Sequence, residues 1–156
     1  MKVRSVVLFF FLSALSALAT SAAAAETAEQ PIPPAHLMQP AELAALLHAG
    51  GERPLVLQVG SRVLFAQAHI PDSEYVGAAG QDAGLQALEA RVQKLDRAQP
   101  IVIYCGCCPW PKCPNIRRAY AKLDGMGFTH VRVLYIADNF GADWVDKGFP
   151  VARDEQ

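Results

Sequence analysis

The sequence predicts an α/β domain with a mainly parallel central sheet that helices cover on both faces. Three compact apolar runs, over 55–59, 101–104 and 131–135, have the length and composition of buried strands. Amphipathic segments separate these runs, and strands that alternate with helices in this way form parallel sheets. Because ligands of such sheets bind at the carboxyl ends of the strands, we expect a functional site there.

Composition narrows the class of protein further. The chain has 156 residues, of which 52% are hydrophobic and 19% charged, so it is too apolar for a disordered protein. The formal net charge of −1 gives no support for nucleic-acid binding, which normally requires a basic face. Four cysteines are too few for a small fold held together by disulfides, so their presence needs another explanation.

The N-terminal segment has the features of a signal peptide. Lys2 and Arg4 precede an almost wholly apolar stretch over 6–18, which is short for a membrane span. Ala23 and Ala25 fit the small-residue rule for cleavage, so we expect a cut after Ala25. Export would place the mature chain in the periplasm or outside the cell, free of the membrane. An uncleaved N-terminal anchor is the alternative.

These features divide the chain into four parts. The signal peptide over 1–25 precedes a polar, Pro-rich linker over 26–34. A single domain over 35–152 follows, and a polar tail over 153–156 ends the chain.

The first half of the domain is predicted to contain two short helices around one strand. Pro40 stands before a helix over 41–48, because proline is tolerated at a first helical position. The strand over 55–59 follows that helix. Ser61 can then cap a helix that reaches residue 68, before a turn over 69–72.

The second half is predicted to alternate helix and strand. Apolar residues recur there at three- and four-residue steps and define an amphipathic helix: Leu85, Leu88, Val92 and Leu95. The strand over 101–104 leads through a loop over 105–115 to a helix over 116–126. After the strand over 131–135, Asn139 can cap a last short helix.

All four cysteines lie in the loop after the second strand: Cys105, Cys107, Cys108 and Cys113. Core cysteines scatter along a chain, so this clustering indicates a site. A loop that enters a helix presents unpaired N–H groups and a partial positive charge, both of which stabilise a thiolate. We therefore expect Cys105 to be an exposed, ionised nucleophile. The alternative is a disulfide that merely fixes the loop.

Other residues of this loop are candidates for the site or its pocket: Gly106, Trp110, Lys112, Asn115, Arg117 and Arg118. The three cations among them can add positive potential, or be ordinary solvated charges. The indole of Trp110 can cover the site as a lid, or pack on the surface of its own domain.

Five short motifs stand in order along nearly the whole mature chain. They are Leu55-Val56-Leu57-Gln58-Val59; Ala68-His69-Ile70-Pro71-Asp72; Ile101-Val102-Ile103-Tyr104-Cys105; Ala119-Tyr120-Ala121-Lys122-Leu123 with Gly127-Phe128; and the strand over 131–135 with Trp144 and Gly148-Phe149-Pro150-Val151. In this order they resemble the motifs of rhodanese-like domains, the sulfurtransferase family with a three-layer α/β/α fold.

The resemblance implies a function for the cysteine loop. In that family the cysteine after the second of these strands accepts sulfane sulfur as a persulfide and passes it to a thiol or another acceptor. By position, Cys105 takes that role, with Cys107, Cys108 and Cys113 as resolving or redox candidates. The implied partners are a small sulfur donor and a thiol acceptor, such as a periplasmic redox protein, and no cofactor is implied.

The chain departs from the family pattern at two places. Gln58-Val59-Gly60 stands where many rhodaneses have Asp-Val-Arg. The cysteine loop is also longer than the usual six residues, and three prolines within it lack N–H donors. We therefore expect the amide cradle around the nucleophile to differ from that of the family.

Two alternative functions for the cysteines stay open. Cys105 and Cys108 have the spacing of a dithiol redox motif, which would make the chain a thiol–disulfide redox protein. The four thiols can instead bind a soft metal without catalysis, although Cys107 and Cys108 are adjacent and make four-fold chelation awkward. Cu(I), which accepts two or three thiolates, suits the loop better than tetrahedral zinc.

Overall fold

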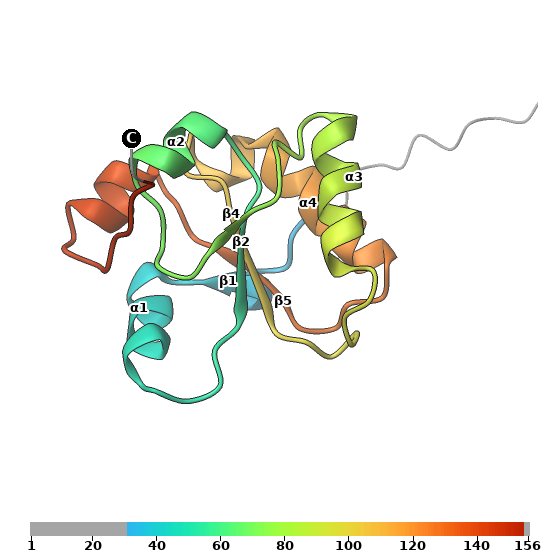
Figure 1. Ribbon diagram of the computed structural model, residues 1–156, viewed down its shortest axis with the longest axis horizontal. Coiled ribbons are helices and arrows are strands. Elements are labelled where there is room, and N and C mark those ends of the chain that lie inside the picture. The colour runs from blue at the N-terminus through green and yellow to red at the C-terminus, as the bar shows by residue number, and fades with distance from the viewer. Residues whose placement is uncertain (1–30, 155–156) are drawn as a thin grey trace, which may run out of the picture.

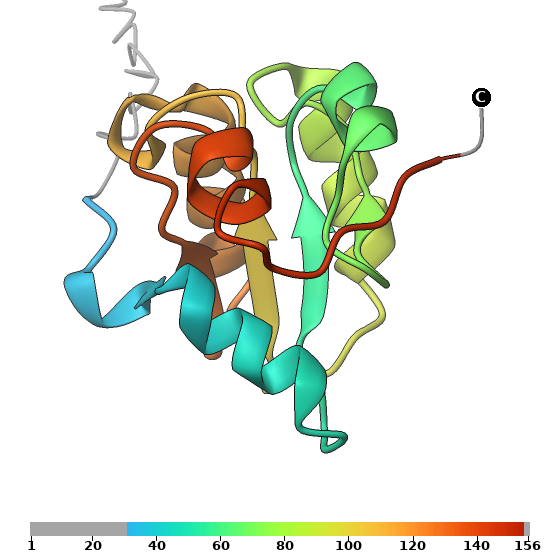
Figure 2. The same ribbon diagram turned by 90° about the vertical axis from the view of Figure 1, so that its left-hand side faces the viewer.

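A computed structural model describes residues 31–154 and contains one five-stranded sheet. The strands stand in the order β1-β5-β4-β2-β3 and every pairing is parallel. Their bounds are β1 Leu37–Met38, β2 Leu55–Gln58, β3 Glu74–Tyr75, β4 Ile101–Tyr104 and β5 Val131–Leu134. The carboxyl ends of β2 and β4 point to the same end of the molecule (Figure 2).

Helices and short helical turns connect the strands. They are η1 Pro34–His36, α1 Pro40–His48, α2 Arg62–Gln67, α3 Asp82–Val92, η2 Trp110–Lys112, α4 Pro114–Gly125 and the π-helical turn η3 Gly141–Val145. In Figure 1, α3 and α4 lie on one side of the sheet and α1 lies on the other. The predicted three-layer α/β/α fold with a parallel sheet is therefore confirmed.

Alternating side chains of the strands build a separate core on each face. On one face, Leu57, Ile101 and Ile103 belong to a buried cluster with the apolar residues of α3 and α4. On the other face, Val102 and Tyr104 pack in a cluster with α1 and with Trp144 of η3. Tyr104 thus lies on the face covered by α1, whereas its neighbour Cys105 lies on the face covered by α3 and α4.

The main differences from the sequence expectation concern β1, α3 and α4. β1 was not predicted, because two residues are too few to show a periodic pattern. The helix α3 ends at Val92, since Leu95 lies beyond it in a turn. The helix α4 begins at Pro114 rather than at residue 116, because proline is accommodated at a first helical position.

The predicted signal peptide over 1–25 lies outside the described residues. Of the predicted linker over 26–34, residues from 31 onward are described, and Ile32 is buried in the core cluster. The predicted tail over 153–156 is also tied down at its start, because the Asp154 N–H donates to the Ala66 carbonyl and its carboxylate pairs with Arg62. Within residues 31–154, no helix has the length and apolar character needed to span a membrane.

Candidate active site

The main chain of Cys105 is held between the carboxyl ends of two adjacent strands. It directly follows β4, whose last carbonyl accepts a hydrogen bond from Val59 N–H at 2.9 Å. The side-chain amide of Gln58, the last residue of β2, donates to the Cys105 carbonyl at 3.1 Å and accepts from Gly60 N–H. A cysteine at this position is therefore fixed by the rigid centre of the sheet rather than by the loop alone.

The thiol of Cys105 packs against Gly60, where the sequence departs from the family pattern. A Cβ atom at residue 60 would lie 2.5 Å from the Cys105 Sγ and 3.1 Å from its carbonyl oxygen. Any larger residue at this position would displace the sulfur, so Gly60 makes room for it.

Cys105 is buried, which corrects the prediction of an exposed thiolate. Its relative exposure is 3%, and its pKa is raised by hydrogen bonding with the neighbouring thiolate of Cys113 and by burial. Cys105 is nevertheless one of the residues that line a pocket of about 340 Å³, so a small molecule that fills the pocket lies next to this residue.

The helix-terminus effect that was predicted for Cys105 falls on Cys113 instead. Cys113 is the N-cap residue of α4 and has an exposure of 0%. A hydrogen bond from the Cys105 thiol lowers the pKa of Cys113 to about 5, and the Ile116 and Asn115 N–H groups add to this effect against the cost of burial. The two thiols therefore titrate as a coupled pair, in which Cys113 is the first to lose its proton and Cys105 the last.

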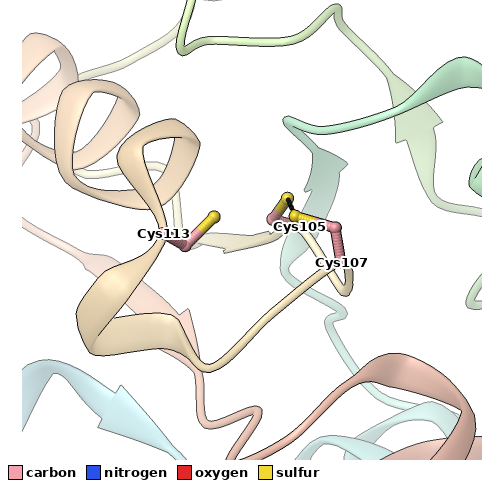
Figure 3. A group of neighbouring side chains, drawn as sticks. All are labelled: Cys105, Cys107 and Cys113. Carbon is pink, nitrogen blue, oxygen red and sulfur yellow. Dashed lines mark hydrogen bonds between the residues drawn. The ribbon is translucent and has the colours of Figure 1, made fainter.

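Cys107 and Cys108 lie nearer the surface, and Cys107 is drawn in Figure 3. The Sγ of Cys107, which is exposed, lies 3.1 Å from the Cys105 Sγ and 3.3 Å from that of Cys108. Burial and a hydrogen bond with Cys107 raise the pKa of the Cys108 thiol to about 12. All four are free cysteines.

Asn115 connects the Cys105 sulfur to the loop before α3. The Gly80 N–H donates to the Asn115 Oδ1 at 2.6 Å, and the Asn115 Nδ2 donates to the Cys105 Sγ at 3.3 Å. Because only the oxygen can accept from Gly80, the amino group must face the sulfur. Asn115 thus supplies a hydrogen-bond donor to any negative charge on Cys105, as its inclusion among the candidate site residues predicts.

The three predicted cations do not line the pocket. Arg118 instead donates to the Gly80 carbonyl and to the Asp82 carboxylate, both at 2.6 Å, so it supports the loop that holds Asn115. Lys112 and Arg117 have exposed side chains outside the pocket lining. None of these three side chains is therefore placed to contact a molecule in the pocket, because sequence proximity does not fix the direction of a side chain.

Trp110 packs on its own domain rather than over the pocket. The backbone N–H of Trp110 donates to the Ile136 carbonyl at 2.9 Å, and the centroid of its ring lies 6.2 Å from that of the Tyr135 ring. Gly106, with φ of 83°, lets the loop lie against Phe140, whose Cβ would be 2.7 Å from a Cβ at residue 106. The Phe140 N–H donates to the Gly106 carbonyl at 3.0 Å, so the loop is anchored on both sides of the cysteines.

The pocket beside Cys105 has an amide-rich and apolar lining without any basic or acidic side chain among the described residues. It is lined by Gln58, Leu64, Gln67, Ala68, Tyr104, Cys105, Gly106, Cys107, Asn139, Phe140, Gly141 and Val145. No sequence motif marks Leu64 and Gln67 of α2 or Val145 of η3, because these residues turn toward a loop that is distant in sequence. Gln58 carried a signal, since it stands at the departure from the Asp-Val-Arg pattern.

Comparison with known proteins agrees with this architecture. The rhodanese-like domain family matches residues 39–135, well over half of the chain, and the chain therefore belongs to that family. A comparison with curated proteins found no match.

Several solved structures share the fold at low sequence identity. The Alr3790 protein from Anabaena sp. is 18% identical, with a TM-score of 0.59 over 76% of this chain and 94% of that one. The BH2092 protein from Bacillus halodurans is 22% identical, with a TM-score of 0.57 over 76% and 77% of the two chains. At these identities the likeness establishes the fold alone.

A third structure is larger. EanB, solved as a cysteine persulfide in a tetrahedral intermediate state with ergothioneine, is 20% identical with a TM-score of 0.56. The match covers 74% of this chain and 27% of EanB.

Proposed function

We propose that the chain is an exported sulfurtransferase that accepts sulfane sulfur as a persulfide on Cys105 and passes it to a thiol acceptor. Membership of the rhodanese-like family and the cysteine-rich loop support a sulfurtransferase-type or related role. The persulfide that EanB carries on a cysteine is in keeping with this chemistry.

One geometric observation carries the proposal. Cys105 follows the carboxyl end of β4 and is one of the residues that line the pocket, and its sulfur receives an N–H from Asn115 and lies within 4.8 Å of the Cys113 sulfur. The Cys113 thiolate can take the proton of Cys105 as the latter attacks, which compensates for the raised pKa of the buried nucleophile.

The proposed transfer consists of two displacements on sulfur. The Cys105 thiolate attacks the outer sulfur of a donor R–S–SH, the donor S–S bond breaks, and R–S⁻ leaves with the electron pair. An acceptor thiolate then attacks the outer sulfur of the Cys105 persulfide, and the Cys105 thiolate leaves. Neither displacement needs an oxidant or a reductant.

The pocket lining favours an uncharged donor. Transferring a dianion such as thiosulfate into a pocket without a basic side chain is costly, because the charge would lose water without gaining a partner. The protonated form R–S–SH of an organic persulfide with an uncharged R group avoids this cost. We therefore propose that the donor is an uncharged persulfide rather than an inorganic anion.

Intact-mass measurement tests the proposal. The reduced protein is incubated with an uncharged organic persulfide, and each molecule is expected to gain one sulfur atom. Cys105→Ser should abolish this gain. Cys108→Ser is the matched control and should retain it, since Cys108 lies in the same loop outside the group of sulfurs near Cys105. Equal gain in wild type and Cys105→Ser would refute the proposal.

Export is proposed on the strength of the N-terminal sequence. A bacterial host that expresses the full chain should release a periplasmic form that begins at Glu26. A periplasmic form that keeps Lys2 and Arg4 would instead indicate the uncleaved anchor.

A second candidate function is thiol–disulfide exchange. The Cys105 and Cys113 sulfurs lie in one group within 4.8 Å, which favours Cys113 over Cys108 as the partner of Cys105. Cys113 could also resolve a persulfide by attacking the Cys105 sulfur, which releases hydrosulfide and leaves a disulfide for a dithiol protein to reduce. Loss of two hydrogens on mild oxidation, with a mapped disulfide between residues 105 and 113, would support this candidate.

A further inference from the structure

Three of the four cysteine sulfurs converge on one point although they come from different elements. The Sγ atoms of Cys105, Cys107 and Cys113 all lie within 4.8 Å of one another. Cys105 follows β4, Cys107 lies in the loop, and Cys113 begins α4. Figure 3 shows the three side chains pointing toward one region between the strand end and the helix.

The spacing of these sulfurs suits a three-coordinate metal ion. A metal bound about 2.3 Å from each of three thiolates needs sulfurs about 4 Å apart. Two of the ligands, Cys105 and Cys113, are fixed by burial, with exposures of 3% and 0%. Cys107 lies 3.1 Å from Cys105 and is exposed, so it can move outward by the small distance required.

The surroundings of the cluster are those of a thiolate site. The Asn115 amide donates to the Cys105 sulfur at 3.3 Å, and Cys113 is the N-cap residue of α4, where the partial positive charge of the helix N-terminus favours a thiolate. Such outer hydrogen bonds orient ligands and balance their negative charge. Cys107 leaves one side open to solvent, through which an ion can arrive.

The choice of metal follows from the number and softness of the ligands. Structural zinc sites use four ligands in tetrahedral geometry. Among the described residues, neither Cys108 nor any histidine, aspartate or glutamate belongs to the group that could hold an ion. Soft thiolates select Cu(I), which is satisfied by fewer ligands than zinc.

We infer that Cys105, Cys107 and Cys113 form a three-thiolate binding site for Cu(I). This inference does not rest on sulfur transfer. Because Cys105 is shared, bound Cu(I) and a Cys105 persulfide exclude each other, and copper occupancy would block the proposed transferase chemistry.

The test is an anaerobic titration of the fully reduced protein with Cu(I) held by a competing chelator. We expect one Cu(I) per chain and an X-ray absorption spectrum with three sulfur neighbours. Cys107→Ser removes an exposed ligand and is expected to weaken binding by at least about 10-fold, since even changes outside the ligand set typically cost that much.

Cys108→Ser is the matched control, because it removes an adjacent thiol that lies outside the group. It should bind Cu(I) as wild type does. Failure to bind one equivalent, or an equal loss in Cys107→Ser and Cys108→Ser, would overturn the inference. Zn(II) tested alone should bind more weakly than Cu(I), and tighter zinc binding would also count against it.

The outcome is separable from that of the proposed function. Wild type is assayed twice, for sulfur uptake without metal and for Cu(I) binding without a persulfide donor, and a protein that gains sulfur but binds no Cu(I) would contradict only the copper site. A protein that binds Cu(I) but gains no sulfur would contradict only the transferase proposal.

Discussion

At the scale of single residues, a few contacts decide which sulfur reacts and which is ionised. Cys105 is held by the sheet and lines the pocket, whereas Cys113 is the N-cap residue of α4, where the backbone groups of Asn115 and Ile116 help to lower its pKa. The sequence places both residues in one loop but does not give the direction of either side chain. For this reason the lowered pKa was assigned to Cys105, although the cause, a helix terminus next to a thiol, was identified correctly.

Asn115→Asp tests the donor that faces the nucleophile. The new carboxylate can still accept from Gly80 N–H, but it turns an oxygen instead of an N–H group toward the Cys105 sulfur. Loss of a hydrogen bond to a charged group costs about 1.5–3 kcal/mol, so persulfide formation should slow by roughly 10-fold or more. The rate should also need a higher pH, because a second negative charge disfavours the thiolate.

Both the slower rate and its shift to higher pH can be measured by quenching the reaction of Asn115→Asp at several times and pH values and recording the intact mass. Thermal unfolding should stay close to that of wild type, since the bond to Gly80 is retained. An unchanged pH–rate profile would show that Asn115 is only a structural contact.

Gly60→Ala tests the space that the sulfur occupies. A Cβ 2.5 Å from the Cys105 Sγ forces the side chain or the strand end to shift, which typically costs about 1–3 kcal/mol. We expect a lower urea midpoint together with slower persulfide formation. Gly51→Ala is the control, because nothing lies within 4 Å of its Cβ. Similar behaviour of the two variants would mean that the thiol does not pack at Gly60.

At the scale of elements, the start of α4 places Cys113 at a helix N-terminus, which helps to lower the pKa of its thiol. The helix and its apolar face could be predicted from periodicity, and the loop before it from three prolines. Its first turn could not, because Cys113 and Pro114 do not have the usual sequence of a helix cap. β1 was not predicted for a simpler reason, since it has only two residues.

The ionisation of Cys113 predicts a thiolate at mildly acidic pH. Ultraviolet absorbance should report about one thiolate per chain with a midpoint near 5. The signal should move to higher pH in Cys113→Ser and shift much less in Cys108→Ser, because the serine hydroxyl can still donate the hydrogen bond that Cys108 donates to Cys113. Absorbance that develops only near the ordinary pKa of 9 in wild type would contradict this assignment.

The same shift predicts how stability depends on pH. Between about 5 and 9, the folded Cys113 has lost a proton that the unfolded thiol still holds, so its contribution to the free energy of unfolding rises with pH. This contribution is lost as the pH falls through 5. Urea unfolding at several pH values should therefore show a gap between wild type and Cys113→Ser that widens from pH 5 upward. A gap of constant size would contradict the lowered pKa.

At the scale of the whole molecule, the fold was predictable and the character of the pocket was not. The parallel sheet, its two helical layers and the position of the cysteines at a strand end follow from hydrophobic patterns and from the order of the motifs. The pocket depends on Leu64 of α2 and on Val145 and Phe140 near η3, which are distant in sequence from Cys105. Only the packing of α2 and η3 in the folded chain brings these three residues to the same pocket as Cys105.

The charge-free pocket predicts which donors are used. Wild type should take up sulfur from an uncharged organic persulfide faster than from thiosulfate. Leu64→Lys places a cation in the pocket lining and should raise the rate with thiosulfate by about 10-fold or more, in the range seen for electrostatic attraction of substrates. High salt should reduce that gain.

Val63→Lys is the matched control for this change. Val63 is also in α2, is 65% exposed and does not line the pocket, so the same charge there should have little effect. An equal gain in the two variants would indicate general electrostatic attraction rather than a change in the pocket.

The most direct test of sulfur transfer through Cys105 is to locate the sulfur atom that the protein gains. After incubation with an organic persulfide, thiols and persulfides are alkylated, and the digested peptides are sequenced by tandem mass spectrometry. We expect the additional sulfur on Cys105, and thiols without additional sulfur at residues 107, 108 and 113. Additional sulfur on Cys107 or Cys113, with Cys105 unmodified, would contradict it.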